Sequence, residues 1–303
     1  MEKSTQPTWL GSMENVRTIV VLLGCISNGK KDQRIRCEID TNGVVFLSQS
    51  KGKSLHIKSA ISKKIFRTFE MLDDMTEGEQ DPQTRYPYAF CLDAALFLEC
   101  LSVFGSTAQS HTSIQLAYYD QNCELGILLE ERGVICECSL RVLEADTVDI
   151  DCYELESCFE SSDVVGRCII QSRPLRDAFL ELYDLPSAAS VTISMKHSTS
   201  KSSTAPVNGL FLRAESNAGS CEIVFRERSD AFIEFKCNHL PGQSLADSSF
   251  HVAILQHAFK ALNHATESFL RMTQNGMLSV QHMILTGGGE RAFVDALICC
   301  DDA

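Results

Sequence analysis

Long hydrophobic runs are scarce in this sequence of 303 residues. The longest, Ile19 to Ile26, is eight residues long, whereas a membrane-spanning helix needs about 20. The run starts late for a signal peptide, and the SNGKK that follows it is unlike a cleavage site of small residues. We therefore expect neither a membrane protein nor a secreted one.

Basic residues are also in the minority, because 27 Lys and Arg stand against 40 Asp and Glu, a formal net charge of −13. Taken over the whole chain, this charge argues against nucleic-acid binding of the histone or basic-arm type. The acids are concentrated, however. Residues 144–163 hold eight acids and no base, and the segments on either side are nearly neutral. We interpret 144–163 as a connector between two domains.

Motifs for metal binding and for nucleophilic catalysis are missing as well. The sequence contains no CxxC and no HExxH, and Gly287–Gly289 lack the lysine of a phosphate-binding loop. The 14 cysteines are spread over the whole length, which favours buried free thiols in a reducing compartment over a disulfide scaffold. We expect no metal, no cofactor and no enzymatic activity.

Four segments have the apolar spacing of short, one-sided helices. They are residues 14–26, 93–104, 172–182 and 253–264. Between them the apolar residues alternate with period two, which is typical of strands. The clearest examples are residues 34–39, 113–119, 134–140, 191–195 and 231–237. Proline is rare, with 7 residues, and the sequence predicts an α+β protein built on large antiparallel sheets.

The chain repeats itself once. Asn42-Gly43 aligns with Asn208-Gly209 at a separation of 166 residues, and Phe90 aligns with Phe250 at 160. The first and third predicted helices align at 159. Three landmarks in one register indicate the duplication of a domain of about 140 residues. We divide the chain into a mobile tail (1–12), an N-terminal domain (13–143), the acidic connector (144–163) and a C-terminal domain (164–303).

Two such copies joined by an acidic connector resemble the sliding clamps of the proliferating-cell-nuclear-antigen type. Four stretches narrow the resemblance: AFCLDAALFLECLSVFG, IIQSRPLRDAFLEL, NGMLSVQHMI and FVDALICCDD, which begin at residues 89, 169, 275 and 293. They are similar to the Rad-one type subunit of the nine-one-one DNA-damage checkpoint clamp. The resemblance runs in order from residue 13 to residue 302.

The resemblance implies a nuclear, non-catalytic subunit of a heterotrimeric ring that encircles double-stranded DNA. Four short helices would line the inner face of duplicated clamp domains, with antiparallel sheets outside. It also implies two sibling clamp subunits, a checkpoint clamp loader, and repair and signalling proteins that dock through short motifs. A replicative homotrimeric clamp, which acts as a processivity factor, is the alternative within the same fold.

A 3′–5′ DNA exonuclease is the enzymatic alternative, because members of the family have carried that label. Paired carboxylates such as Asp149 with Asp151, and Asp301 with Asp302, are able to hold metal ions for phosphodiester hydrolysis. One pair lies in the acidic connector and the other at the chain end, and neither has a His or Glu at a fixed spacing. We therefore place this activity below the clamp function.

Under the clamp interpretation, the solvent faces of the helices supply the residues that face DNA. They are Arg17, Arg173, Arg176, His257, Lys260 and His264. The last three are spaced to project from one side of the fourth helix. The second helix differs from the others, since Asp93 and Glu99 are its only charges.

The resemblance also implies two strand edges for subunit contacts and a pocket for partner peptides under the connector. The edge residues are Glu124, Gly126, Ile127 and Leu128 in the first domain, and Cys221, Ile223 and Phe225 in the second. The pocket residues are Val148, Ile150, Tyr153, Met283 and Phe293. Each of these residues has the alternative of being ordinary core.

Overall fold

The structure is a computed structural model that describes residues 6–72, 88–105, 111–145, 150, 153–196, 208–237 and 247–301. The chain divides into two compact units. Unit 1 comprises residues 1–48, 58–150 and 285–292, and unit 2 comprises residues 49–57, 151–284 and 293–303. The main division, after Ile150, falls inside the predicted connector.

Unit 1 is built from two antiparallel sheets and two helices. Its elements are β1 (Trp9–Met13), α1 (Arg17–Ile26), β2 (Arg34–Asp40), β3 (Gly43–Gln49), β4 (Leu55–Ser62), η1 (Lys63–Ile65), β5 (Thr68–Met71), β6 (Tyr88–Asp93), α2 (Ala94–Leu101), β7 (Ser113–Tyr119), η2 (Asp120–Asn122), β8 (Glu124–Glu131), β9 (Val134–Arg141) and β10 (Leu143–Glu144). One sheet has the order β5-β1-β7-β8-β9, and the other runs β10-β6-β2-β3-β4. Strand β4 contributes residues to both units.

Unit 2 repeats this plan and adds one helix. Its elements are α3 (Tyr153–Glu160), β11 (Val164–Gln171), α4 (Ser172–Tyr183), β12 (Ser190–Lys196), β13 (Gly209–Ser216), β14 (Gly219–Arg226), β15 (Phe232–Cys237), β16 (Ser248–His251), α5 (Val252–Ala258), η4 (Phe259–Asn263), β17 (Ala265–Thr273), β18 (Leu278–Leu285) and β19 (Arg291–Ile298). The sheets have the orders β14-β13-β12-β16 and β19-β18-β17-β11-β15. The predicted α+β fold of duplicated antiparallel domains is confirmed.

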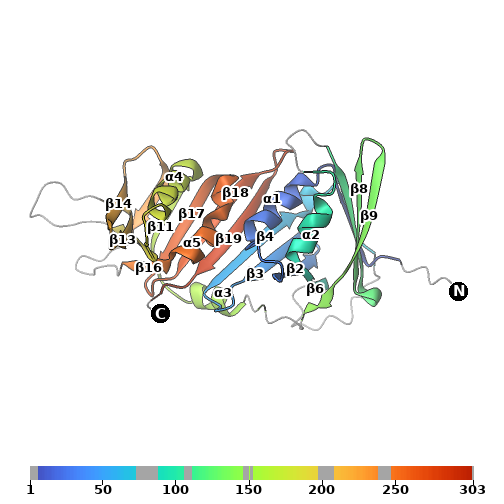
Figure 1. The fold of residues 1–303 in the computed structure, drawn as a ribbon, viewed down its shortest axis with the longest axis horizontal. Coiled ribbons are helices and arrows are strands. Elements are labelled where there is room, and N and C mark those ends of the chain that lie inside the picture. The colour runs from blue at the N-terminus through green and yellow to red at the C-terminus, as the bar shows by residue number, and fades with distance from the viewer. Residues whose placement is uncertain are drawn as a thin grey trace, which may run out of the picture. The chain divides into compact units, whose positions relative to one another are not determined.

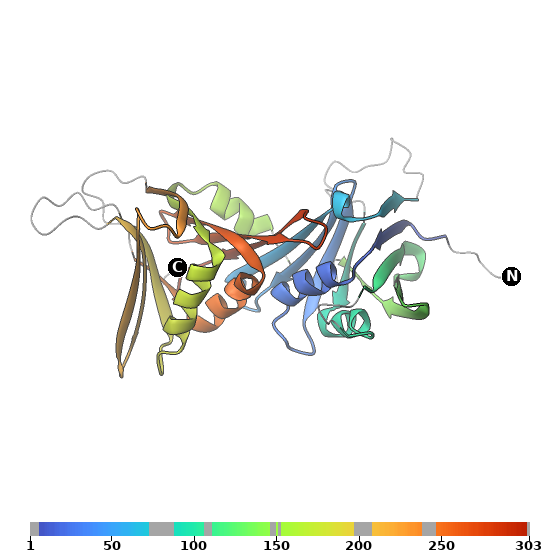
Figure 2. The same cartoon turned by 90° about the horizontal axis from the view of Figure 1, so that it is seen from above.

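In each unit a pair of helices covers one face of the sheets (Figures 1 and 2). Helix α1 packs beside α2, and Phe97 of α2 lies 6.1 Å, ring to ring, from Phe46 of β3. Helix α4 packs beside η4, where the rings of Phe179 and Phe259 are 4.2 Å apart. Burial of these apolar stripes holds each helix pair on its sheet.

The Asn-Gly pairs that mark the sequence repeat place a glycine at a tight backbone contact in both units. Gly43 and Gly209 have φ angles of 154° and 157°, a region in which glycine is favoured. A Cβ on either would collide with a backbone carbonyl oxygen, that of Ile61 at Gly43 and that of Phe225 at Gly209. Close approach of two backbones therefore explains why glycine stands at both repeat positions.

The predicted mobile tail is wrong for residues 9–12. Strand β1 starts at Trp9, whose side chain is 1% exposed, and it pairs with both β5 and β7. The indole also makes edge contacts with the rings of Phe66 and Phe69 at 6.0 and 5.5 Å. A strand of five residues that also contains Gly11 and Ser12 is too short for its periodicity to be recognised in the sequence.

The predicted connector is not extended throughout, because Tyr153–Glu160 forms helix α3. Phe159 is 5% exposed, and the guanidinium of Arg271 in β17 lies 4.9 Å from its ring. In Figure 2, α3 (light green) lies across the unit 2 sheet from α4 and α5. Acids and apolar residues alternate here, and this pattern imitates a strand although the segment is helical.

The fourth predicted helix is shorter as an α-helix than residues 253–264. It is α-helical only over α5, and from Phe259 to Asn263 it tightens into the 3₁₀ turn η4. His264 is the residue that follows the turn. The prediction that His257, Lys260 and His264 share one side of a continuous α-helix is therefore wrong, because the change of pitch alters their angular spacing.

Candidate nucleic-acid interface and sheet edges

Helix α4 presents two cations from its first two turns. Arg173 is exposed, and the side chain of Arg176 is 34% exposed. Nη2 of Arg176 lies 2.9 Å from the carboxylate of Asp177, so part of its charge is compensated within the helix. Lys260 is exposed on the neighbouring turn η4. Unit 2 thus carries three formal cations on its helix layer.

A buried polar network fixes the start of α4. The hydroxyl of Ser172, the first helical residue, lies 2.7 Å from the hydroxyl of Ser268 in β17. Ser268 in turn lies 2.8 Å from Nδ1 of His282 in β18. Burial lowers the pKa of His282 to about 4, so the imidazole is neutral at physiological pH. The network orients the helix from which Arg173 and Arg176 project.

The helix layer of unit 1 is poorer in positive charge. Arg17 is exposed at the first residue of α1, where Oδ1 of Asn15 accepts its backbone N–H at 2.9 Å. Helix α2 carries the exposed Glu99 and exposes Leu96. Asp93 caps α2 by accepting the N–H of Leu96 at 2.9 Å. The uneven distribution of charge predicted from the sequence therefore persists on the folded helices.

Strand β14 lies at an edge of its sheet, as the sequence analysis expects. It pairs with β13 over its whole length, and among the described strands no other pairs with its far side. Cys221, Ile223 and Phe225 are partly exposed along it. Their contact with another subunit stays a prediction.

Strand β8, the predicted edge of unit 1, is internal. It lies between β7 and β9, so Glu124, Gly126, Ile127 and Leu128 are one strand away from the edge. Leu125, Ile127 and Leu129 are buried on one face of β8, the alternation of an antiparallel sheet with one covered face. The prediction that these residues form an edge is wrong, because local alternation does not reveal how many neighbours a strand has.

The edge of this sheet is β9, seen beside β8 in Figure 1. Val134 and Ile135 at its start are 58% and 63% exposed. The Sγ atoms of Cys136 and Cys138 lie 3.8 Å apart on one side of the strand. The sequences of β8 and β9 alternate in a similar way, so local pattern carries no signal that distinguishes the edge strand from its neighbour.

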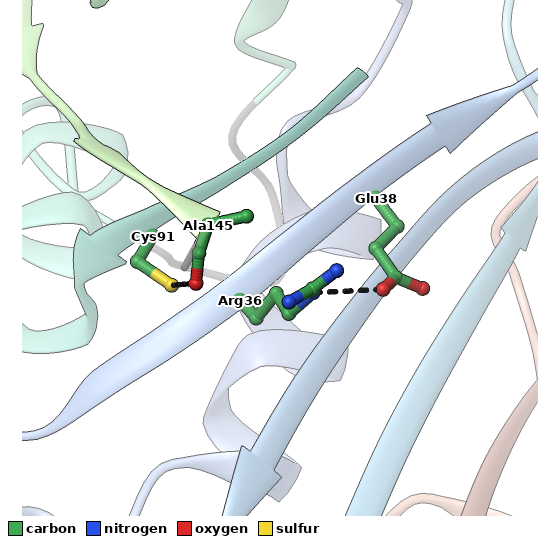
Figure 3. A network of polar contacts seen from close by, with 4 residues as sticks. All are labelled: Arg36, Glu38, Cys91 and Ala145. Atoms are coloured by element: carbon green, nitrogen blue, oxygen red, sulfur yellow. Dashed lines mark hydrogen bonds and ion pairs between the residues drawn. The ribbon is translucent and has the colours of Figure 1, made fainter. Parts of the chain in front are cut away.

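The connector starts against the outer strands of unit 1 (Figure 3). The thiol of Cys91 in β6 lies 3.7 Å from the carbonyl oxygen of Ala145, just beyond β10. Cys91 stands opposite Arg36 of β2, whose Nε donates to Glu38 Oε1 at 2.8 Å. The Glu38 side chain is 2% exposed, so this is a nearly buried ion pair. The start of the connector is therefore anchored beside a fixed charge pair.

The predicted pocket residues have mixed surroundings. Ile150 is buried, whereas Tyr153 at the start of α3 is 37% exposed. Met283 and Phe293 are half-buried, and by strand alternation they lie on the sheet face opposite the helix layer. Val148 lies outside the described residues. These placements do not test a docking role.

The described residues contain no group of three or more His, Cys, Asp or Glu side chains placed to hold a metal ion. Asp149, Asp151 and Asp302 lie outside the described part of the chain, so the exonuclease alternative stays untested. Every described cysteine is a free thiol. Within the same residues, no helix is long and apolar enough to cross a membrane.

Comparison with known proteins gives matches over almost the whole chain. The family model described as "Repair protein Rad1/Rec1/Rad17" matches residues 9–284. The chain is 26% identical to the cell cycle checkpoint protein RAD1 of Homo sapiens, over 99% of this chain and 94% of the human protein. It is 25% identical to the DNA damage checkpoint control protein rad1 of Schizosaccharomyces pombe, over 93% and 83% of the two chains.

The fold is similar to that of a solved sliding clamp. The PCNA structure from Thermococcus kodakaraensis superimposes with a TM-score of 0.69. The match covers 97% of this chain and 100% of the archaeal one, at 15% sequence identity. At that identity the likeness concerns the fold.

Proposed function

Because the chain belongs to the Rad1/Rec1/Rad17 family of repair proteins, we propose that it is a non-catalytic subunit of a heterotrimeric checkpoint clamp. The ring encircles DNA at damage sites and serves as a platform for checkpoint signalling and repair proteins. The observation that carries this proposal is the family match across residues 9–284 together with a clamp fold over 97% of the chain.

The charges of the helix layers suit a protein that holds DNA by enclosure. Arg17 in unit 1, and Arg173, Arg176 and Lys260 in unit 2, supply a few phosphate contacts without base recognition. A binding site with few ionic contacts releases few counterions, so the total electrostatic affinity for DNA is low and the ring is free to slide. His257 and His264 add contacts of the same kind.

Subunit contacts are proposed at the two sheet edges, β9 in unit 1 and β14 in unit 2. An open antiparallel edge offers a row of backbone hydrogen-bonding groups to a partner strand. We assign the two sibling clamp subunits to these edges. The connector and α3 are assigned to repair and signalling proteins with short docking motifs, and a clamp loader and a nuclear location follow from the same function.

The test is retention of the assembled ring on DNA. Changing Arg17, Arg173, Arg176 and Lys260 to Glu should shorten retention on linear DNA with open ends at physiological salt, because repulsion replaces the phosphate contacts of these four residues and the enclosing ring slides off the ends sooner. Each contact removed should also lower the slope of log affinity against log salt by about 0.9. Assembly with the sibling subunits should be unchanged.

A matched control reverses charge away from the helix layers. Lys63→Glu with Lys64→Glu alters two exposed cations on η1 and should leave retention intact. Unaltered retention in the four-residue variant would refute the assignment of the helix faces. A chain that joins no ring with any sibling subunit would refute the function itself.

A further inference from the structure

Two thiols lie side by side on strand β9 of unit 1. Cys136 and Cys138 are two residues apart in the strand, so both side chains are on the same face of the sheet. Their Sγ atoms are 3.8 Å apart, and both cysteines are free and half-buried. Each sulfur is therefore in contact with the other and still partly open to solvent.

The geometry of the strand opposes a disulfide between these two cysteines. Strand β9 pairs with β8 in one register from Val134 to Arg141, without a bulge. Two residues of an antiparallel strand span about 6.8 Å, and side chains on one face keep their Cβ atoms nearly as far apart. A disulfide needs Cβ atoms that are only about 3.8 Å apart. The strand would have to bend to form the bond, so β9 favours the reduced pair.

An ion bound between the two sulfurs fits the pair without this bend. A disulfide brings the sulfurs to about 2.05 Å, whereas a bridging ion separates them by two metal–sulfur bonds. Such bonds are about 2.3 Å long for zinc, and two bonds of similar length in line span somewhat more than the present 3.8 Å. A small rotation of the two side chains supplies the difference, and the backbone keeps its pairing with β8.

The surroundings favour a soft ion that needs only two ligands. Leu129 and Ile127 of β8, which lie opposite the two cysteines, are 0% and 1% exposed, so the neighbouring side chains are apolar. The described residues contain no group of three His, Cys, Asp or Glu side chains placed to hold an ion. Zinc in structural sites takes four ligands, as do iron–sulfur clusters. Cu(I) is bound by soft sulfur ligands and is stable in line between two thiolates.

A third thiol lies next to the pair. Cys100, in the last turn of α2, is within hydrogen-bonding reach of Cys138. Its S–H is able to donate to a sulfur that has become negatively charged, and hydrogen bonds of this kind stabilise metal-bound ligands. Cys100 thus supports the pair without serving as a ligand.

We propose that Cys136 and Cys138 bind one soft monovalent cation of the Cu(I) class in a two-coordinate site. Each thiol releases its proton and each sulfur bonds to the ion, so one Cu(I) and two thiols give a site with a single negative charge and two protons. The copper keeps its oxidation state. The proposal does not depend on the clamp function.

Anaerobic titration of the reduced full chain with Cu(I), in competition with the coloured chelator bicinchoninate, tests this proposal. Cys136→Ser and Cys138→Ser should each lower the bound Cu(I) by one ion per chain. The double variant should lose no more than either single variant, because both sulfurs are needed. Unchanged binding in either single variant would overturn the site.

A measurement on the parent protein does not depend on how the variants fold. Saturating Cu(I) should protect Cys136 and Cys138 together from N-ethylmaleimide, and peptide mass spectrometry measures the alkylation of each. Alkylation of either cysteine at the rate of the copper-free protein would overturn the proposal.

Cys123→Ser is the matched control. Cys123 is a half-buried cysteine of the same unit, and its thiol donates to the carbonyl oxygen of Asp120 at 3.7 Å rather than to another thiol. Its replacement should leave the number of bound Cu(I) ions unchanged. An equal loss in this control would show unselective binding to thiols and overturn the pair as a site.

Zn²⁺ is the control for the ion. Because zinc needs more ligands than the pair offers, Cys136→Ser and Cys138→Ser should leave the binding of Zn²⁺ unchanged. Loss of a tightly bound Zn²⁺ in these variants would show a site with additional ligands and overturn the two-coordinate proposal.

Discussion

The helix layers of the two units share one architecture but are stabilised differently. In unit 1 the layer is apolar, with Phe97 of α2 packed near Phe46, and α2 is capped by Asp93. In unit 2 the equivalent helix α5 starts without a side-chain cap, and the layer is joined to the sheet by the buried Ser172 of α4 together with Ser268 and His282. Duplication has preserved the shape of the domain, while the interactions that hold it have diverged.

The difference extends to charge. One exposed arginine, Arg17, starts the unit 1 layer, whereas Arg173, Arg176 and Lys260 stand on the unit 2 layer. A subunit in a ring of three different chains does not need to present equal charge from both of its halves. The comparison shows that unit 2 carries most of the formal positive charge of the two helix layers.

The largest effect on stability should come from deleting one aromatic ring from either helix layer. Phe179→Ala and Phe97→Ala each remove a ring that is at most 1% exposed, and each should cost about 3–5 kcal/mol. Hydrogen exchange should speed up in α4 and η4 for the first variant, and in α2 and β3 for the second. Faster exchange throughout both units in either variant would show that the two layers do not act independently.

The second largest effect should come from acidification, which acts on unit 2 through His282. His282 has a pKa of about 4 in the folded chain, against about 6.5 when unfolded, so the unfolded state binds more protons between these values. The stability contributed by neutral His282 is therefore full above pH 6.5 and is lost as pH falls toward 4, by up to about 3 kcal/mol. Urea unfolding across this range measures it.

His282→Gln should flatten the pH dependence between pH 6.5 and 4, whereas changing the exposed His251 to Gln should leave it as in the parent. If His282→Gln does not fold, NMR titration of His282 in the parent protein decides the question. An imidazole that titrates near pH 6.5 in the folded protein would contradict the prediction.

The helix cap should give the smallest effect. Asp93→Ala removes the side chain that accepts the N–H of Leu96 and should destabilise unit 1 by about 1 kcal/mol. Asp93→Asn keeps an oxygen that accepts the N–H of Leu96 and should recover most of the loss. The charge that it removes matters little, because the ion pair of Asp93 with Arg34 is long, at 3.6 Å, and partly exposed. Thermal unfolding of both variants measures the difference, and equal losses would assign the role to the charge.

Much of the candidate site is predictable from the sequence, and the errors have a common origin. Arg17, Arg173 and Lys260 are found because helical periodicity indicates which residues are left exposed. The edge in unit 1 is misplaced by one strand, since β8 and β9 differ in their neighbours and not in their local alternation. His282 is missed because a single histidine in an apolar strand gives no sign of the two serines that it meets.

The sequence by itself determined the short helices, the alternating strands, the duplication and the concentration of acid near residue 150, because each depends on residues close together in the chain or on a repeated pattern. Only the tertiary structure decided that Trp9 belongs to a sheet, that Tyr153–Glu160 is a helix whose Phe159 packs against Arg271, and that β9 is an edge strand. These features depend on contacts between distant segments, and pairing energy between distant strands leaves no mark in local periodicity.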